Sequence, residues 1–224
     1  MSRYCPICET HHEKFNSFGY NPREDALCPN CRSLERHRLS WLIVKNKLEN
    51  VDLSYKTMLH IAPEKVFVSK FNNLFKENYL TADLNAKDVK ITMNITNIEY
   101  PDESFDFIYC SHVLEHIVDD RKAMRELSRV VKKDGWAILL VPIMTKGPTE
   151  EDFSIIASEE RMKHYGHPDH VRNYGTDYKT RLEESGWDVE VVNAEDFLTS
   201  EEIEGMGITK AAGEIYFCTK VTKR

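Results

Sequence analysis

The sequence lacks any long apolar run. The longest, Trp136–Met144, covers nine of the 224 residues, whereas a membrane-spanning helix needs about 20 consecutive apolar residues. The opening residues, MSRYCPIC, also lack the apolar stretch of a signal peptide. These two absences predict a soluble, cytoplasmic protein that has no membrane partner.

Glycine and proline are scarce, with nine and eight residues. Their scarcity excludes collagen-like and low-complexity chains, and no internal repeat is visible. A composition of 41% hydrophobic and 30% charged residues is typical of a globular protein. The length suits one large α/β domain, or one domain with a small appendage.

An excess of positive charge is also missing. The chain has 30 Lys/Arg against 37 Asp/Glu, for a net charge of −7, which is unfavourable for a general binder of phosphate backbones. The first 50 residues hold eight basic and six acidic side chains, whereas the remainder holds 22 and 31. Any nucleic-acid contact is therefore expected to be local and near the N-terminus.

Cysteine is infrequent, yet four of the six cysteines form two C-x-x-C pairs, CPIC at 5–8 and CPNC at 28–31. This spacing is typical of a four-thiolate zinc site. A disulfide framework would need an oxidising compartment, and a thioredoxin-like motif would need only one pair. We therefore predict a structural zinc ion in an N-terminal zinc ribbon. Its expected ligands are Cys5, Cys8, Cys28 and Cys31.

The zinc ribbon and the helix after it are expected to occupy residues 1–50. Apolar residues at core-like spacing predict a helix over 33–48, with Ser33 as its N-cap. Basic side chains on this helix suit either a nucleic-acid face or an ordinary solvated face, and the sequence leaves both open. These side chains are Arg32, Arg36, Arg38, Lys45 and Lys47.

Residues 51–224 alternate between strand-like and helix-like segments, which predicts an α/β domain with a mostly parallel sheet covered on both faces. A long connection at 142–175 is expected to form a functional loop or lid. Gly135 is expected near the end of the second helix. Strands are predicted at 57–62, 79–84, 89–95, 105–110, 136–141, 187–192 and 214–221, and helices at 66–75, 121–131 and 176–185.

Polar residues follow three of these strands, where an open α/β sheet binds its ligands. The first strand ends in the segment His60–Glu64, the second in Asp83, and the fourth in Cys110-Ser111-His112. An acid at the end of the second strand is placed to bind a ribose diol, although a turn or cap role is the alternative. The pattern favours a cofactor that contains a nucleoside.

Residues 104–143, SFDFIYCSHVLEHIVDDRKAMRELSRVVKKDGWAILLVPI, resemble the core of class I S-adenosylmethionine-dependent methyltransferases. The likeness extends over about residues 55–224. Together with the paired cysteines and DHVRNYG at 169–175, it is similar to a subgroup with an N-terminal zinc ribbon. The resemblance implies an enzyme with a Rossmann-like, seven-stranded, mostly parallel sheet whose last strand is antiparallel.

The same resemblance implies which residues contact S-adenosylmethionine. Asp83 matches the acid that binds the ribose, and Leu84 would pack on the adenine. Asn94 would accept a hydrogen bond from the adenine amino group through its carbonyl oxygen, while Ser111 and His112 match residues beside the sulfonium. The remaining expected contacts are His60, Ala62 and Glu64, in a turn where the family carries glycines and this chain has no G-x-G.

The segment at 169–175 is expected to carry the acceptor chemistry. His170 is predicted to be the general base and Asp169 the residue that orients it. Arg172 is predicted to hold an anionic group of the substrate, with Tyr174 beside it. The alternative is a lid that closes over the cofactor.

Other histidines offer competing assignments. His112 is an alternative base, and His116 is a weaker one. His164, His167 and His170 are three residues apart and suggest a metal site, but Gly166 and Pro168 interrupt the helix that would align them.

We therefore expect a methyltransferase that acts on a small molecule or a glycan precursor. One alternative is an RNA methyltransferase whose zinc ribbon binds the substrate. Another is a non-catalytic protein that binds zinc and cofactor, since the usual glycines are missing. The sequence assigns neither the acceptor atom nor the oligomeric state.

Overall fold

The computed structural model describes residues 2–221, and its contacts divide the chain into two compact units. The sequence predicted a boundary at residue 50. The N-terminal unit also contains Val192–Ile215, which the sequence analysis assigned to the catalytic domain. Its parts are the residues up to Asp52, Lys65–Lys70 and Val192–Ile215, and the second unit comprises Leu53–Glu64, Phe71–Val191 and the residues from Tyr216 onward.

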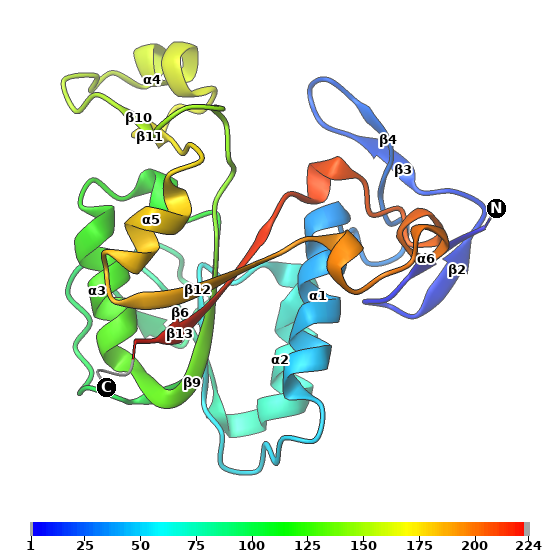
Figure 1. Ribbon diagram of the computed structural model, residues 1–224, viewed down its shortest axis with the longest axis horizontal. Coiled ribbons are helices and arrows are strands. Elements are labelled where there is room, and N and C mark those ends of the chain that lie inside the picture. Colours follow the sequence, from blue (N-terminus) through cyan, green and yellow to red (C-terminus); the bar gives the residue numbers. More distant parts are fainter. Residues whose placement is uncertain (1, 222–224) are drawn as a thin grey trace. The chain divides into compact units, whose positions relative to one another are not determined.

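The N-terminal unit is built from short hairpins and helices (Figure 1). Two antiparallel pairs, β1 with β2 and β3 with β4, precede helix α1. Their bounds are Arg3–Cys5 (β1), Thr10–His12 (β2), Asn16–Phe18 (β3), Arg23–Leu27 (β4), Glu35–Leu48 (α1) and Ser200–Gly205 (α6).

Arg38, on the predicted basic helix, is fully buried. Its guanidinium donates to the carbonyls of Ala26, Ser33 and Gly207 at 2.8–3.0 Å and lies 4.4 Å from the centre of the Phe15 ring. These contacts offset part of the cost of burying the cation, whose Nε has no hydrogen-bond partner within the described residues. Arg38 therefore ties the late segment to the N-terminal unit and is not part of an exposed basic face.

The second unit contains the seven-stranded sheet, in the order β12-β13-β9-β8-β5-β6-β7. The strands from β5 to β9 pair in parallel, and β13 runs antiparallel to β9. The predicted Rossmann-like sheet is confirmed. The strand bounds are Met58–Ile61 (β5), Tyr79–Asp83 (β6), Ile91–Thr92 (β7), Phe105–Ser111 (β8), Val131–Leu140 (β9), Trp187–Val192 (β12) and Ile215–Lys220 (β13).

Successive side chains along the central strands point to opposite faces of the sheet, because a β-strand is pleated. His60 and Tyr109 pack their rings 5.3 Å apart on one face, and Phe71 of α2 lies 5.3 Å from His60. Cys110 points into the other cluster, which includes Leu127 of α3. The helices are α2 (Lys65–Phe75), α3 (Asp120–Val130) and α5 (Tyr178–Glu183).

The β9 strand differs from its prediction at its start. Helix α3 ends at Val130, so Gly135 lies inside β9 and not at a helix end. A Cβ atom at position 135 would lie 2.3 Å from the Asp106 carbonyl oxygen. Only glycine permits this close approach between β8 and β9. The predicted strand at 89–95 is also shorter, because only Ile91–Thr92 pairs with β6.

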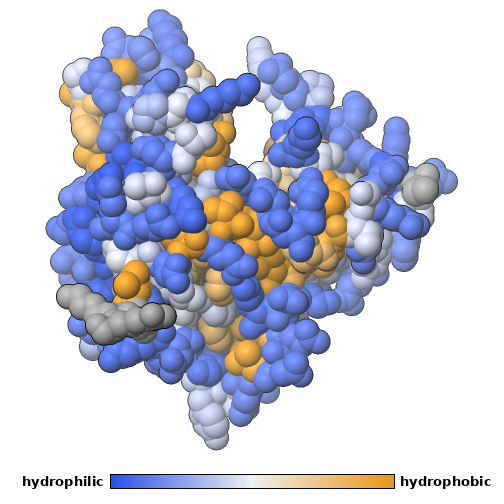
Figure 2. All heavy atoms as spheres, in the orientation of Figure 1, coloured by the Kyte–Doolittle hydropathy of each residue, from blue (hydrophilic) through white to orange (hydrophobic). Residues whose placement is uncertain are grey.

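The connection between β9 and α5 carries its own short elements, β10 (Glu150–Glu151), α4 (Ser158–Tyr165) and β11 (Arg172–Asn173). In Figure 1 these elements lie above α5. Hydrophilic residues cover most of the molecular surface seen in Figure 2. None of the helices within residues 2–221 has the length and apolar character that crossing a membrane requires.

Gly135 provides a stability test. We expect Gly135→Ala to lower the free energy of unfolding by at least about 1–3 kcal/mol, because the new methyl group overlaps the backbone of β8. The matched control is Gly205→Ala, where no atom lies within 4 Å of an added Cβ. Urea unfolding measures both variants, and wild-type stability of Gly135→Ala would contradict this packing.

Candidate active site

A cavity of about 520 Å³ lies at the carboxyl ends of β5, β6 and β8. This is the end at which open α/β sheets bind ligands. Every residue that lines it belongs to the second unit. Its polar lining residues are Asp83, Asn85, Asn94, His112, His116, Arg161 and Asp169.

The turn after β5 keeps a glycine-like conformation without glycine. Ala62 has φ = +46°, in the left-handed region that glycine favours. Its amide donates to the Ala82 carbonyl at 2.8 Å. The small Ala62 side chain lines the cavity, so the backbone can approach a ligand closely there.

Asp83 presents one carboxylate oxygen to the cavity. Its Oδ1 accepts from the amides of Asn85 and Ala86 at 2.7 and 2.8 Å, which fixes the orientation of the group. Within the described residues, Oδ2 has no hydrogen-bond partner. Leu84 beside it is 53% exposed and also lines the cavity.

Asn94 lines the cavity with its amide group in a fixed orientation. The backbone N–H and the hydroxyl of Thr96 both donate to Asn94 Oδ1, at 3.0 and 2.9 Å. Because a backbone N–H is only a donor, the group it contacts is the carbonyl oxygen. The carbonyl oxygen that was expected to accept from the adenine therefore already accepts two hydrogen bonds from Thr96.

Three predicted cofactor contacts, His60, Glu64 and Ser111, do not line the cavity. His60 donates through Nδ1 to the Tyr79 hydroxyl, and its Nε2 accepts from the Glu64 amide. Burial lowers the pKa of His60 to about 4. Ser111 is 3% exposed. They belong to the correct strand ends, but His60 points to the aromatic face of the sheet.

His112 forms a pair that the sequence analysis missed. It lines the cavity with φ = +56°, and its Nδ1 lies 3.2 Å from Oε1 of Glu115. Glu115 is 1% exposed and sits on the 3-10 turn Leu114–His116. The spacing His-x-x-Glu directly after a buried strand was the available signal, since one turn brings such residues together.

The connection between β9 and α5 brings His167 and His170 close to His116. The ring centres of His116 and His170 are 4.7 Å apart, and those of His167 and His170 are 4.6 Å apart. His164, which the sequence grouped with them, lies outside this cluster.

The predicted Asp169–His170 pair has no side-chain hydrogen bond. Asp169 instead accepts through its carbonyl from Nδ1 of His116 at 3.3 Å. Burial lowers the pKa of His170 to about 4, so the ring is neutral at pH 7 and a weaker base than ordinary histidine.

Arg172 and Tyr174 are buried in the base of the loop. Arg172 is 1% exposed, and it donates to the carbonyls of Leu114 and Val118 and to the carboxylate of Glu151. Because protein groups accept these hydrogen bonds, Arg172 is committed to the loop and not to a substrate clamp. Arg161 is instead the cationic side chain that lines the cavity within the described residues.

Tyr174 is fixed in the same region. Its hydroxyl donates to Asp120 at 2.6 Å, and Arg181 pairs with the same carboxylate at 2.9 Å. Burial raises the pKa of Tyr174 well above its usual range, so the hydroxyl stays protonated and acts as a donor in the loop.

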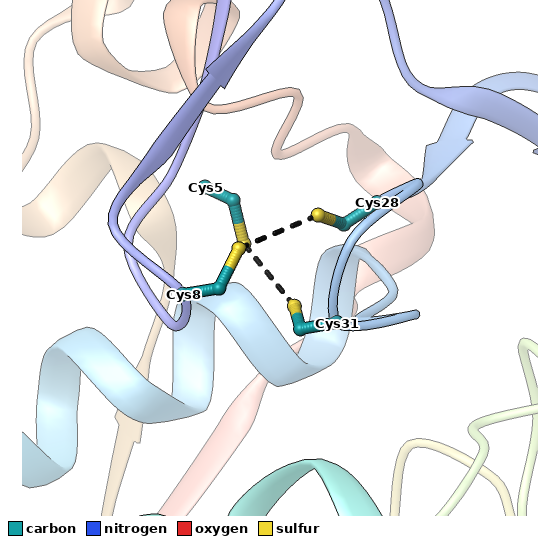
Figure 3. Close-up of side chains that lie close together, drawn as sticks. All are labelled: Cys5, Cys8, Cys28 and Cys31. Atoms are coloured by element: carbon teal, nitrogen blue, oxygen red, sulfur yellow. Dashed lines mark hydrogen bonds between the residues drawn. The ribbon is translucent and has the colours of Figure 1, made fainter.

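The four N-terminal cysteines converge in the first unit (Figure 3). Cys5 Sγ lies 3.5 Å from Cys31 Sγ, and Cys8 Sγ lies 3.7 Å from Cys28 Sγ. A tetrahedral zinc ion with Zn–S bonds of about 2.3 Å requires sulfurs about 3.8 Å apart. The donor set therefore fits zinc in number, type and spacing.

Polar groups around the sulfurs complete this arrangement. Ser33, predicted as a helix N-cap, places its hydroxyl 3.2 Å from Cys5 Sγ and 3.3 Å from Cys31 Sγ, while Leu34 is the N-cap. Thr10 Oγ1 lies 2.9 Å from Cys8 Sγ. Hydroxyls that contact the sulfurs orient the ligands of a metal site.

Part of the chain is similar in sequence to known methyltransferases. Residues 49–139 match a family described as methyltransferase domain. The uncharacterized methyltransferase YcgJ from Bacillus subtilis is 34% identical over 76 residues, which cover 34% of this chain and 28% of that relative. The match thus spans less than a third of the relative's length.

Two solved structures share the fold. An S-adenosylmethionine-dependent methyltransferase from Mesorhizobium loti aligns with a TM-score of 0.53 and 13% identity, covering 80% of this chain and 96% of that one. The 1,6-didemethyltoxoflavin-N1-methyltransferase of Burkholderia thailandensis aligns with 0.52 and 11%, covering 84% and 79%. Residues 49–139 thus match a methyltransferase-domain family, and the sheet has the fold of S-adenosylmethionine-dependent methyltransferases.

Proposed function

We propose that this protein transfers the methyl group of S-adenosylmethionine to a small molecule or glycan precursor. The observation that carries the proposal is the cavity at the strand ends, which presents an unpartnered Asp83 oxygen on one side and the His112–Glu115 pair on another. The first group suits a ribose diol, and the second suits proton removal from an acceptor.

The cofactor-binding part of the proposal rests on complementary groups. Oδ2 of Asp83 accepts from the ribose hydroxyls, and the exposed side chain of Leu84 packs against the adenine. Asn94 donates through Nδ2 to a ring nitrogen of the base. The left-handed turn at Ala62 would let the backbone come close to the methionine part of the cofactor.

His112 is the base that the geometry supports best. Methyl transfer needs alignment of the acceptor with the methyl carbon, and also a base when the acceptor is a hydroxyl or a protonated amine. Glu115 fixes the ring of His112 and stabilises the charge that develops on it. His170 is less suited to this task, because burial disfavours its protonated form.

A small acceptor is favoured over RNA by the charges in the chain. Residues 51–224 carry a net negative charge, and Arg38 of the basic helix is buried. Arg161 at the cavity supplies one local positive charge for an anionic acceptor. A small acceptor is in keeping with the Burkholderia thailandensis enzyme of the same fold, whose structure contains bound 1,6-didemethyltoxoflavin.

Zinc at the four cysteines has a structural role in this proposal. The strands around it are three to five residues long, and hairpins of strands this short form no stable core of their own. A tetrahedral ion supplies the missing cross-links.

The activity is tested by incubating the purified protein with S-adenosylmethionine that carries an isotopically labelled methyl group. Host extract is divided into a small-molecule fraction and an RNA fraction, and mass spectrometry follows the label in each. We expect labelled product among the small molecules. Label in RNA alone would overturn the substrate class, and cofactor binding without label in either fraction would support the non-catalytic alternative.

Asp83→Asn tests the ribose contact. Asparagine keeps a carbonyl oxygen for the amides of Asn85 and Ala86 but replaces Oδ2 with a donor. We expect affinity for S-adenosylmethionine to fall by about 5–150-fold, equivalent to about 1–3 kcal/mol. Calorimetry measures it, with the exposed Asp88→Asn as the matched control. Equal affinity in Asp83→Asn and wild type would remove Asp83 from the site.

His112→Gln and Glu115→Gln test the base. We expect the rate of label transfer to fall by about 10²–10⁴-fold in His112→Gln. Glu115→Gln is expected to lower kcat less than His112→Gln, because it removes only the orienting group. His170→Gln provides the comparison. If this variant loses methyl-transfer activity while His112→Gln keeps the wild-type rate, the general base is His170.

Cys8→Ser tests the zinc ribbon. We expect this variant to lose one equivalent of zinc relative to wild type by elemental analysis, since three thiolates hold the ion far less tightly than four. Cys218→Ala is the control, because Cys218 is a buried thiol outside the cluster. Full zinc content in Cys8→Ser would exclude the site.

A further inference from the structure

Three histidines meet beside the cavity, outside the groups assigned to the cofactor and the base. His116 comes from the turn after β8, and His167 and His170 come from the loop after α4. One ring nitrogen of each lies within 4.8 Å of the others. We propose that these three residues bind one divalent transition-metal ion, and that the ion is zinc-like in its ligand preference.

The hydrogen bonds around two of the rings favour coordination. Nδ1 of His116 donates to the Asp169 carbonyl at 3.3 Å, which leaves its Nε2 lone pair for a metal, as in many metal-binding histidines. Nδ1 of His170 is buried and has no hydrogen-bond partner in the described part of the chain. At His167, Nδ1 accepts from the Asp169 amide at 3.2 Å. Metal coordination through Nε2 of His167 requires its proton to move from Nε2 to Nδ1. The ring then loses the hydrogen bond from the Asp169 amide.

A buried negative charge lies near the cluster. Glu115 is 1% exposed, and its Oε2 has no hydrogen-bond partner within residues 2–221. Its charge is close enough to act on the ring of His170. Its Oε1 pairs with His112, which is a charged partner only when it is protonated, and incomplete compensation of a buried carboxylate is costly. A divalent cation at the histidines would provide further compensating charge.

The donor type selects the class of metal. Imidazole suits zinc, copper, iron and nickel, whereas magnesium and calcium prefer oxygen ligands. Zn–N bonds of about 2.0–2.1 Å place tetrahedral nitrogens about 3.3 Å apart. The three side chains are only partly buried, so small rotations of the rings bring the nitrogens from the present separation to this one.

The fourth position of the ion would face the acceptor. His116 lines the cavity, and three protein ligands with one open position are typical of catalytic zinc. The role of the ion rests on the proposed methyl transfer: it would bind a hydroxyl or carboxylate oxygen of the acceptor and lower the pKa of a hydroxyl. An acceptor with such an oxygen is therefore the substrate class that the site fits.

Cobalt binding tests the site in the full-length protein. The cysteine-bound zinc is left in place, weakly held metal is removed with a mild chelator, and Co²⁺ is added. We expect one equivalent to bind with d–d absorption and without thiolate charge-transfer bands. His116→Ala and His170→Ala should each weaken cobalt binding by at least about tenfold, since changes outside the ligand shell alone cost about 10–100-fold. His164→Ala is the matched control, because this exposed histidine lies outside the cluster.

Wild-type protein that binds no cobalt, or binds it only with thiolate bands, overturns the metal site. Equal weakening by His164→Ala and His170→Ala also overturns it. S-adenosylmethionine affinity, measured by calorimetry on the same samples, checks that each variant is folded and separates the two proposals. Retained cofactor binding without cobalt binding overturns the metal site alone, whereas cobalt binding without cofactor binding overturns the proposed function and leaves the metal site standing.

Discussion

A network of charges, buried except at Glu151, determines where the loop after β9 lies. Asp120 at the start of α3 pairs with Arg181 of α5 at 2.9 Å, and Glu151 pairs with Arg172 at 2.8 Å. Arg181 also reaches Glu151 at 3.2 Å, which joins the two pairs. Removing one member of such a network leaves an uncompensated buried charge, at a cost of about 3–5 kcal/mol. The loop is therefore fixed at its base by interactions that tolerate little change.

This base supports the side chains that face the cavity. Arg172 donates to three carbonyls of the turn that follows β8, and the Val171 amide donates to the carbonyl of Glu115 at 2.9 Å. The turn that carries His112 and His116 is thus bonded directly to the strand that follows His170. One backbone hydrogen bond and the buried Arg172 side chain therefore hold the turn and the loop together.

Two non-glycine residues with strained backbone line the cavity. Ala62 and His112 both have positive φ, and each follows the last residue of a central parallel strand. A non-glycine residue in this conformation costs about 1–3 kcal/mol. Surrounding hydrogen bonds, such as those from the amides of Ala62 and His112 to neighbouring strands, hold both residues there. This conformational cost is consistent with turns that are shaped for a ligand.

The sequence by itself determined the alternation of strands and helices, the positions of Asp83 and Leu84 at a strand end, and the paired cysteines. Local periodicity and spacing carry that information. Tertiary structure decided what depends on contacts between distant segments. It buried Arg38 and Arg172, paired His112 with Glu115, and replaced His164 with His116 in the histidine cluster. Spacing along the chain indicates which residue types occur near one another. Only tertiary packing determines which side chains face a cavity and which are buried in ion pairs with other residues.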